Sequence, residues 1–166
     1  MSENRMFFNF SFFKIDPKWR WMADLAKEES AKEVEQVIKN SKVKCRTYST
    51  LGIRDDAEFL LWFAADSVEE IQNVVSKIYT TVFGKYIIPS HVYLSSTRPS
   101  IYAKMGRTIS FVAGDEAKKY VIVYPFIKTR EWYLLPLEQR KKMMDEHIDV
   151  GHKFPQVMLN TTYSFG

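Results

Sequence analysis

Residues 57–65, AEFLLWFAA, form an almost uninterrupted apolar segment that is far too short to cross a membrane. A strand buried on both faces has this composition, whereas a strand with one solvent-exposed face alternates polar and apolar residues. The segment therefore predicts a central strand of a sheet. Residues 6–15, MFFNFSFFKI, alternate in part and predict a further strand with Phe8, Phe10 and Phe12 on one face.

Helix signals follow each of these strands. Asp16 before Pro17 predicts the start of a helix that runs to about Asn40. Ser67 and Glu70 form a capping box that predicts the start of a second helix, which Gly84 is expected to end. Two more strands are predicted, over residues 43–53 and 88–97. The order is therefore β-α-β-β-α-β, which predicts an α+β fold of the ferredoxin-like type with two helices on one face of an antiparallel sheet.

The second half of the chain predicts only part of another such unit. Its expected elements are a connector from about Arg98 with a short strand candidate over 108–113, then a strand over 119–127, a helix over 136–149 and a strand over 156–165. Pro136 and Gly151 are the expected start and stop signals of that helix. We expect a ferredoxin-like domain over residues 1–103, and over 104–166 the connector with the first part of a second domain that is truncated.

Composition excludes few classes of protein. The chain has 166 residues, is 46% hydrophobic and 27% charged, and has the balance of an ordinary soluble globular protein. Its net charge of +4 is mild, so it requires no nucleic-acid partner, although it suits an anionic one. The single cysteine, Cys45, excludes an internal disulfide and a cysteine-rich zinc site. No signal peptide or membrane span is evident, so a cytoplasmic location is expected.

Residues 121–152 concentrate the side chains that can carry chemistry. They hold Tyr124, Lys128, Trp132 and His147 on one predicted strand, loop and helix. The helical repeat places His147 at the edge of an apolar stripe, so its imidazole is expected to face an apolar surface. The residues alone leave three roles open for it: an axial iron ligand, a general base or a core histidine.

Metal binding by His147 is restricted by its neighbours. No second histidine or carboxylate follows it at the third or fourth position on the same helical face. One imidazole is sufficient only for a metal that brings its other ligands, as haem iron does. Tyr124, Lys128 and Trp132 are each compatible with ordinary packing or a solvated edge. Their proximity in the sequence nevertheless favours a site for a planar ligand with acidic arms.

Four sequence segments resemble those of the chlorite dismutase-like family of haem proteins, which includes the coproheme decarboxylases. They are SHVYLSSTRPSIY at residues 90–102, YPFIK at 124–128, EWY at 131–133 and MMDEHIDVG at 143–151. The resemblance covers both halves of the chain. It implies paired ferredoxin-like domains of the dimeric α/β-barrel type, rings that are often pentamers, and bound haem b or coproheme. It also implies that the chains of family members continue past the position of residue 166.

The same resemblance implies roles for individual residues. His147 corresponds to the proximal iron ligand, and Tyr124 to the tyrosine that becomes a radical in coproheme decarboxylases. Lys128 is expected to meet a propionate and Trp132 to border the macrocycle. Asn160 stands where chlorite dismutases have an arginine and decarboxylases typically a glutamine, so an amide there disfavours chlorite chemistry.

The resulting prediction is a haem-dependent oxidoreductase similar to coproheme decarboxylase. Its expected reaction is the peroxide-dependent oxidative decarboxylation of coproheme propionates to haem b. The expected partners are an iron porphyrin, peroxide and further copies of the chain, with a pentamer favoured and no nucleic acid or membrane. The alternatives are a non-catalytic haem-binding or haem-trafficking protein, chlorite dismutase itself, and an RNA-binding ferredoxin-like domain, which the absence of an aromatic RNP1 pattern disfavours.

Overall fold

The computed structural model describes residues 5–98 and 118–165. The chain divides into two compact units, of which the first comprises residues 1–98 and 162–166 and the second residues 99–161. The boundary expected after residue 103 and the strand candidate over 108–113 lie outside the described residues.

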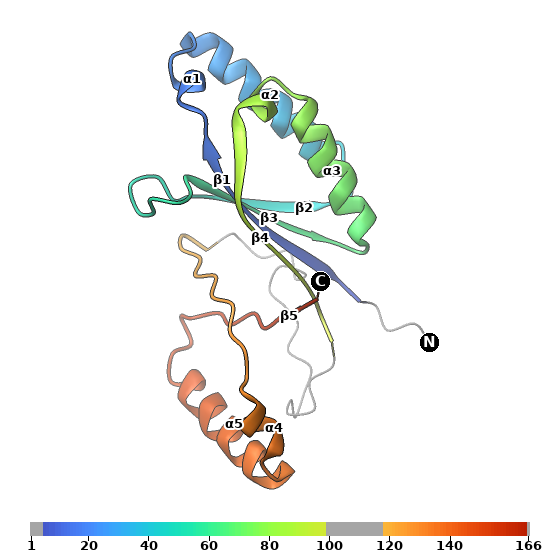
Figure 1. Cartoon of the computed structure of the whole chain (residues 1–166), viewed down its shortest axis with the longest axis vertical. Coiled ribbons are helices and arrows are strands. Elements are labelled where there is room, and N and C mark those ends of the chain that lie inside the picture. Colours follow the sequence, from blue (N-terminus) through green and yellow to red (C-terminus); the bar gives the residue numbers. More distant parts are fainter. Residues whose placement is uncertain (1–4, 99–117, 166) are drawn as a thin grey trace. The chain divides into compact units, whose positions relative to one another are not determined.

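The first unit is built on an antiparallel sheet of five strands in the order β2-β3-β1-β4-β5 (Figure 1). The strands are β1 (Phe7–Ile15), β2 (Lys44–Ser49), β3 (Phe59–Ala65), β4 (Ile87–Ser96) and β5 (Tyr163–Ser164). The apolar segment predicted to be central is β3, which pairs with β1 on one side and β2 on the other. Every residue from Leu60 to Ala65 is buried, which confirms that prediction.

The helices of the first unit lie on one face of this sheet (Figure 1). They are α1 (Pro17–Arg20), α2 (Asp24–Lys39), α3 (Val68–Thr80) and the short 3-10 helix η1 (Phe83–Tyr86). The order of strands and helices and the strand pairing are those of a ferredoxin-like fold, as predicted. The side chain of Ser67 accepts a hydrogen bond from the backbone N–H of Glu70 at 3.2 Å, which confirms the predicted cap of α3.

The first predicted helix is wrong in one respect, because it is divided into α1 and α2. Ala23 has φ −58° and ψ 145°, so the backbone leaves the helical region before α2 begins. Trp19, in α1 before this break, makes two tertiary contacts. Its indole N–H donates to Ser30 Oγ at 3.1 Å, and its ring meets that of Phe83 edge-on with the ring centres 5.0 Å apart. These tertiary contacts outweigh the helical propensity of the intervening residues.

The core of the first unit lies between the sheet and the helices. Its buried members are Phe13, Val34, Val43, Leu61, Phe63, Ala65, Ile71, Val74, Ile78 and Ile87. Phe8, Phe10 and Phe12 share the opposite face of β1, as strand alternation predicts. On that face the rings of Phe10 and Trp62 stack with their centres 5.3 Å apart.

Gly84 allows a close backbone approach at the end of the second predicted helix. A Cβ atom at this position would lie 2.0 Å from the carbonyl oxygen of Ile78, so only glycine fits without movement of the backbone. The helix itself, α3, ends four residues earlier at Thr80, where the Thr81 hydroxyl donates to the Ile78 carbonyl at 2.7 Å. Gly84 therefore permits the turn after the helix and does not itself end it.

The regular secondary structure in the described part of the second unit is helical. It contains α4 (Arg130–Leu134) and α5 (Leu137–His152). The predicted helix over 136–149 is confirmed, but it continues through Gly151 to His152, and Pro136 occupies the N-cap position and not the first helical turn. No residue of α5 is buried.

Two strands predicted in the second half are wrong. Residues 119–127 form no strand, and within 156–165 only Tyr163 and Ser164 do so. These two residues pair with Ser96 and Ser95 of β4 and thereby extend the sheet of the first unit. A strand requires a neighbour for its backbone N–H and C=O groups, and within the described ranges residues 119–127 have none.

In the part of the chain that the structure describes, no helix has the length and apolarity needed to cross a membrane.

Candidate functional site

All five residues singled out from the sequence belong to the second unit. Tyr124 and Lys128 lie on the segment that leads into α4, and Trp132 lies within α4. His147 lies in the last turns of α5, and Asn160 on the segment that follows it. The site residues therefore come from four separate parts of one unit.

Lys128 and Trp132 are in direct contact. The Lys128 ammonium nitrogen lies 4.7 Å from the centre of the Trp132 ring, which is the geometry of a cation–π interaction. Both side chains are half-buried. Such an interaction holds the ammonium group over the ring and contributes about 0.5–2 kcal/mol, depending on how far the pair is removed from water.

The start of α4 determines where this pair lies. The side chain of Thr129 accepts a hydrogen bond from the backbone N–H of Trp132 at 3.4 Å and so caps the helix. Glu131 occupies the first turn, where a hydrogen bond from backbone N–H and another from the Thr129 hydroxyl lower the pKa of its carboxyl group. Sequence reasoning missed Thr129, although a threonine followed by a glutamate in the first turn is a recognisable helix start.

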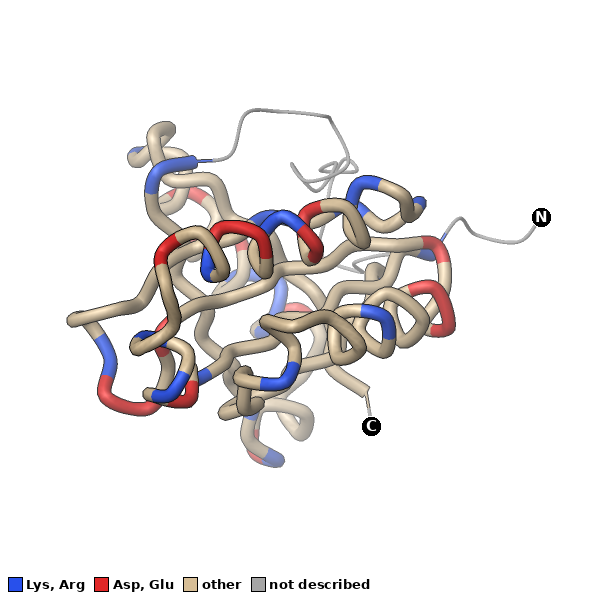
Figure 2. The backbone as a smooth tube through the Cα atoms, turned by 90° about the horizontal axis from the view of Figure 1, so that it is seen from above, with Lys and Arg blue, Asp and Glu red and all other residues tan. Residues whose placement is uncertain are grey.

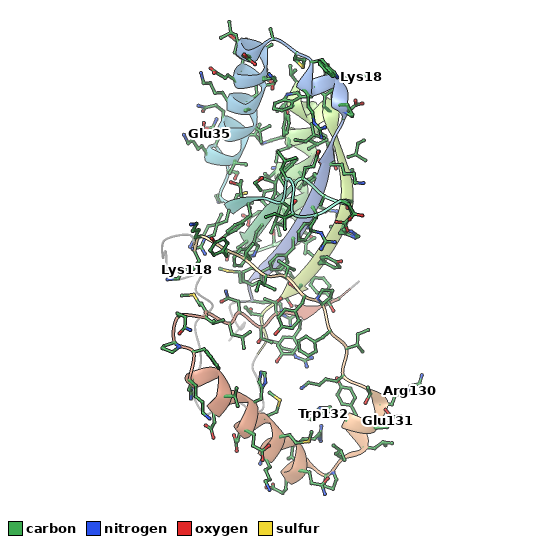
Figure 3. All side chains as sticks on the ribbon, turned by 90° about the vertical axis from the view of Figure 1, so that its left-hand side faces the viewer. Lys18, Glu35, Lys118, Arg130, Glu131 and Trp132 are labelled. Atoms are coloured by element: carbon green, nitrogen blue, oxygen red, sulfur yellow. The ribbon has the colours of Figure 1, made fainter. Side chains whose placement is uncertain are left out.

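The indole nitrogen of Trp132 is a buried donor. Among the described residues, its Nε1–H has no hydrogen-bond acceptor. A buried donor left without an acceptor costs about 1–3 kcal/mol, so native proteins rarely retain one without a reason. An acceptor supplied by a bound ligand removes this cost. In Figure 3, Trp132 and Arg130 extend from α4 in different directions.

The imidazole of His147 is exposed, which corrects the expectation that it faces an apolar surface. The half-buried positions of α5 are Arg140, Met144 and Ile148, which recur every four residues, and His147 lies beside this stripe. The predicted apolar stripe is present only in part, because Arg140 belongs to it and within the described part of the unit no layer covers it fully. An exposed imidazole is accessible to a metal ion.

The donor set around His147 is small. No group of three or more histidine, cysteine, aspartate or glutamate side chains is placed to hold a metal ion within residues 5–98 and 118–165. The nearest other histidine is His152, the last residue of α5. Because it follows His147 by five residues, it points roughly 140° away around the helix. The two histidines therefore cannot ligate one metal ion from the same helical face.

Tyr124 presents an accessible phenol. Its side chain is 58% exposed, and its ring stacks on that of Phe126 with the ring centres 6.0 Å apart. Asn160 is half-buried. Lys128 and Trp132 are thus in direct contact. The joint geometry predicted for Tyr124, His147 and Asn160 stays a prediction.

Charge is mixed along the described chain. Basic and acidic residues are interspersed along the helices (Figure 2). In α5 this mixture includes an ion pair between Lys141 and Glu138 at 3.5 Å. Recognition of an acidic ligand in the second unit consequently depends on particular cations, such as Lys128, more than on the net charge of +4.

These features define an α+β protein with a ferredoxin-like first unit, followed by a unit that presents an exposed His147 and a Lys–Trp pair. Residues 27–166 match the profile of the protein family described as chlorite dismutase. Because this match covers most of the chain, the protein belongs to the chlorite dismutase family.

Individual relatives agree with this assignment. The chain is 34% identical over 139 residues to a coproheme decarboxylase from Mycolicibacterium smegmatis, a match that covers 83% of this chain and 60% of the relative. Two solved structures of chlorite dismutase from Candidatus Nitrospira defluvii share its fold. One is a mutant, with a TM-score of 0.76, and the other is a complex with imidazole, with a TM-score of 0.72.

Both structural matches cover 90% of this chain and 66% of the solved chain at 20% identity, which supports the fold alone. The chain thus spans 60% of the length of the curated relative and about the same share of the solved chains.

Proposed function

We propose that the protein binds an iron porphyrin in its second unit and acts as an oxidoreductase similar to coproheme decarboxylase. The observation that carries this proposal is the Lys128–Trp132 pair, which combines a positioned ammonium group with a buried indole donor. The family match includes this pair and all the other candidate residues. The 34% identity to a coproheme decarboxylase supports the choice of substrate.

The residues present fit an iron porphyrin better than a free metal ion. His147 offers an accessible imidazole, and no group of three or more histidine, cysteine, aspartate or glutamate side chains in the described ranges could hold a metal ion. A porphyrin supplies the equatorial nitrogens itself and needs one proximal histidine from the protein. Its acidic arms need donors, which Lys128 and Trp132 provide. Bound iron porphyrin supplies the one-electron redox chemistry that protein side chains do not perform alone.

Each residue then has a defined task. His147 would hold the iron through its imidazole. Lys128 donates a hydrogen bond to an ionised carboxylate arm, a charge-assisted bond of about 1.5–3 kcal/mol. The phenol of Tyr124 would give up an electron and its proton during oxidation of a propionate by peroxide, and Asn160 would present its amide to the bound ligand. In this proposal the substrates are coproheme and hydrogen peroxide, and the products are haem b, CO2 from the lost carboxylates and water from the reduced peroxide.

Oligomerisation and location belong to the same proposal. We propose a homo-oligomer, with a pentamer favoured, in the cytoplasm. A reducing compartment suits a chain with a single cysteine and therefore no internal disulfide. Burial raises the pKa of Cys45 to about 12 and so keeps its thiol protonated.

A second candidate function is haem binding without catalysis. It is favoured by the exposure of His147 and Tyr124, because an incompletely covered site holds its ligand weakly and admits water to the redox-active residue. Chlorite remains a disfavoured substrate because of Asn160.

Titration of the purified protein with coproheme and with haem b, followed by the Soret band, tests the proposal. The variant His147→Ala is expected to lose the spectrum of the ligated iron, and His152→Ala, on another face of the same helix, is the matched control. Peroxide added to the coproheme complex is expected to yield haem b by mass spectrometry. An unchanged product mass supports the binding protein over the enzyme, and identical spectra for wild type and His147→Ala exclude His147 as the ligand.

A further inference from the structure

The loop that joins β2 to β3 carries an apolar tip. Leu51 and Ile53 lie on either side of Gly52, and their side chains are 65% and 81% exposed. In Figure 1 this loop extends beyond the ends of the two strands. Loop tips are usually built from small and polar residues, and one exposed aliphatic side chain is ordinary. Two of them together at a loop tip form an apolar surface that a partner can cover.

A tight turn fixes the conformation of this tip. The backbone N–H groups of Ile53 and Arg54 both donate to the carbonyl of Thr50, at 2.9 and 3.1 Å. Gly52, inside the turn, has φ 74°, a left-handed conformation that glycine adopts without strain. The hydroxyl of Thr50 donates across the loop to the carbonyl of Ala57 at 2.8 Å. The apolar side chains therefore project from a closed, hydrogen-bonded turn.

The base of the loop is bonded to the sheet. Asp56 accepts a hydrogen bond from Arg54 and lies within hydrogen-bond distance of His91 on β4. The backbone N–H of Thr50 donates to the carbonyl of Glu58 at 2.8 Å. A segment that is ordered before it binds loses little conformational entropy on binding. The loop is thus suited to present its apolar tip to a partner.

The same unit contains an apolar pocket that fits such a tip. The pocket has a volume of about 180 Å³, and its walls include Val34 of α2, Leu61 of β3 and Ile78 of α3. Ala31 and Thr47 also line it and are exposed, so they mark its opening. Apolar cavities of about 150 Å³ stay dry and take up benzene, which is larger than an isoleucine side chain. The pocket therefore has room for one branched aliphatic side chain.

We propose that the loop tip of one subunit enters the apolar pocket of the next subunit, with Ile53 inserted at the opening between Ala31 and Thr47. The partner is a second copy of this chain, because every copy carries both the tip and the pocket that fits it. The tip and the pocket are two different surfaces, so the contact is heterologous, and successive contacts of this kind generate a ring when the rotation closes. The inference rests on the homo-oligomer of the proposed function and not on its porphyrin.

The oligomeric state of the full chain, measured by size-exclusion chromatography with light scattering, tests this contact. Ile53→Asp would place a charge in the apolar pocket, and Ala31→Trp would close its opening. Each is expected to raise the concentration at which the oligomer dissociates at least tenfold. The matched controls are Leu25→Asp, at a side chain that is 66% exposed, and Lys32→Trp, at an exposed residue of α2 that does not line the pocket. A monomeric wild type, an oligomer that survives both variants, or an equal loss in the controls overturns the contact.

Cross-linking identifies which surfaces meet. The double variant Ile53→Cys with Ala31→Cys is treated with a short bis-maleimide, and the native Cys45 adds little background because its thiol is buried and protonated. The proposed contact is expected to give a ladder of covalent products larger than the dimer, and neither single variant is expected to give one. Covalent dimers from Ile53→Cys alone indicate a contact between two tips. Dimers as the largest product of the double variant indicate a two-fold contact, and either result overturns the proposal.

Coproheme titration of the same proteins separates failure of this contact from failure of the proposed function. Ile53 lies in the first unit and the proposed porphyrin site in the second, so Ile53→Asp is expected to bind coproheme within about twofold of wild type. An oligomer that depends on Ile53 but binds no porphyrin supports the contact and overturns the porphyrin site. Porphyrin binding by an oligomer that ignores both Ile53→Asp and Ala31→Trp overturns the contact alone.

Discussion

Asp56 and His91 join a loop to a strand far from it in sequence. The Nε2 atom of His91 on β4 lies 2.7 Å from Asp56 Oδ2, and Arg54 Nε donates to the other Asp56 oxygen at 2.6 Å. The loop between β2 and β3 is therefore tied to β4. The hydrogen bonds from Arg54 and His91 lower the pKa of the Asp56 carboxyl group well below its usual range.

This arrangement predicts a pH dependence of stability. A carboxyl group whose pKa is lower in the folded than in the unfolded state stabilises the fold above its unfolded pKa, near pH 4, and this contribution is lost as the pH falls further. Asp56→Asn is therefore expected to lower the melting temperature at pH 7, with a difference from wild type that shrinks below about pH 4. Asp55→Asn, in the same turn, is the control. A difference that is constant from pH 7 to pH 3 contradicts the prediction.

Replacement of Gly84 by alanine is expected to destabilise the first unit. Its Cβ would overlap the Ile78 carbonyl oxygen, and overpacking of this kind costs about 1–3 kcal/mol in the free energy of unfolding. Gly151→Ala is the matched control, because it lies within α5 and a Cβ there meets nothing within 4 Å. That control is expected to be neutral or to stabilise by up to about 1 kcal/mol. Urea unfolding of both variants measures the two changes in stability. Equal unfolding midpoints for Gly84→Ala and Gly151→Ala would falsify the prediction.

Loss of the Thr129 cap is expected to weaken ligand binding through Trp132. Thr129→Ala removes the acceptor of the Trp132 backbone N–H, a loss of about 1 kcal/mol for a helix cap. Coproheme affinity measured by the Soret titration is expected to fall roughly fivefold. Thr129→Ser retains a hydroxyl and is expected to bind as wild type does. If Thr129→Ser and Thr129→Ala bind coproheme with the same affinity, the cap has no influence on the site.

Tyr124→Phe is expected to separate binding from reaction. The phenol is 58% exposed and stacks on Phe126, and phenylalanine retains this stacking but has no O–H group to oxidise. Coproheme binding is expected to remain within about twofold of wild type, while formation of haem b after addition of peroxide falls at least tenfold. Tyr120→Phe, at a residue that is 76% exposed, is the control. Product formation at the wild-type rate would exclude Tyr124 as the redox-active residue.

Prediction from sequence succeeded where the signals are local. The cap of α3 requires only Ser67 and the next three residues, and the central position of β3 follows from its unbroken apolar composition. It failed where a distant segment decides the outcome. Residues 119–127 have the composition of a strand but pair with no described strand, and Tyr163 and Ser164 instead extend the sheet of the first unit.

The same distinction between local signals and distant contacts applies to the candidate site. His147 was recognised as a possible ligand from its type and spacing, but its exposure depends on what covers α5, which periodicity does not specify. Lys128 and Trp132 were identified as members of a site for an acidic planar ligand. Only the tertiary structure shows that the ammonium group lies over the indole face and that the indole N–H is buried without an acceptor among the described residues.

By itself, the sequence determined the class of fold, the family and the residue types available for binding, because these depend on patterns within short segments and on similarity to relatives. Only the tertiary structure decided which strands pair, where the first helix breaks and how Trp132 holds Lys128. Strand pairing and side-chain contacts depend on groups that are distant along the chain, and their free energies are realised only when the chain brings those groups together.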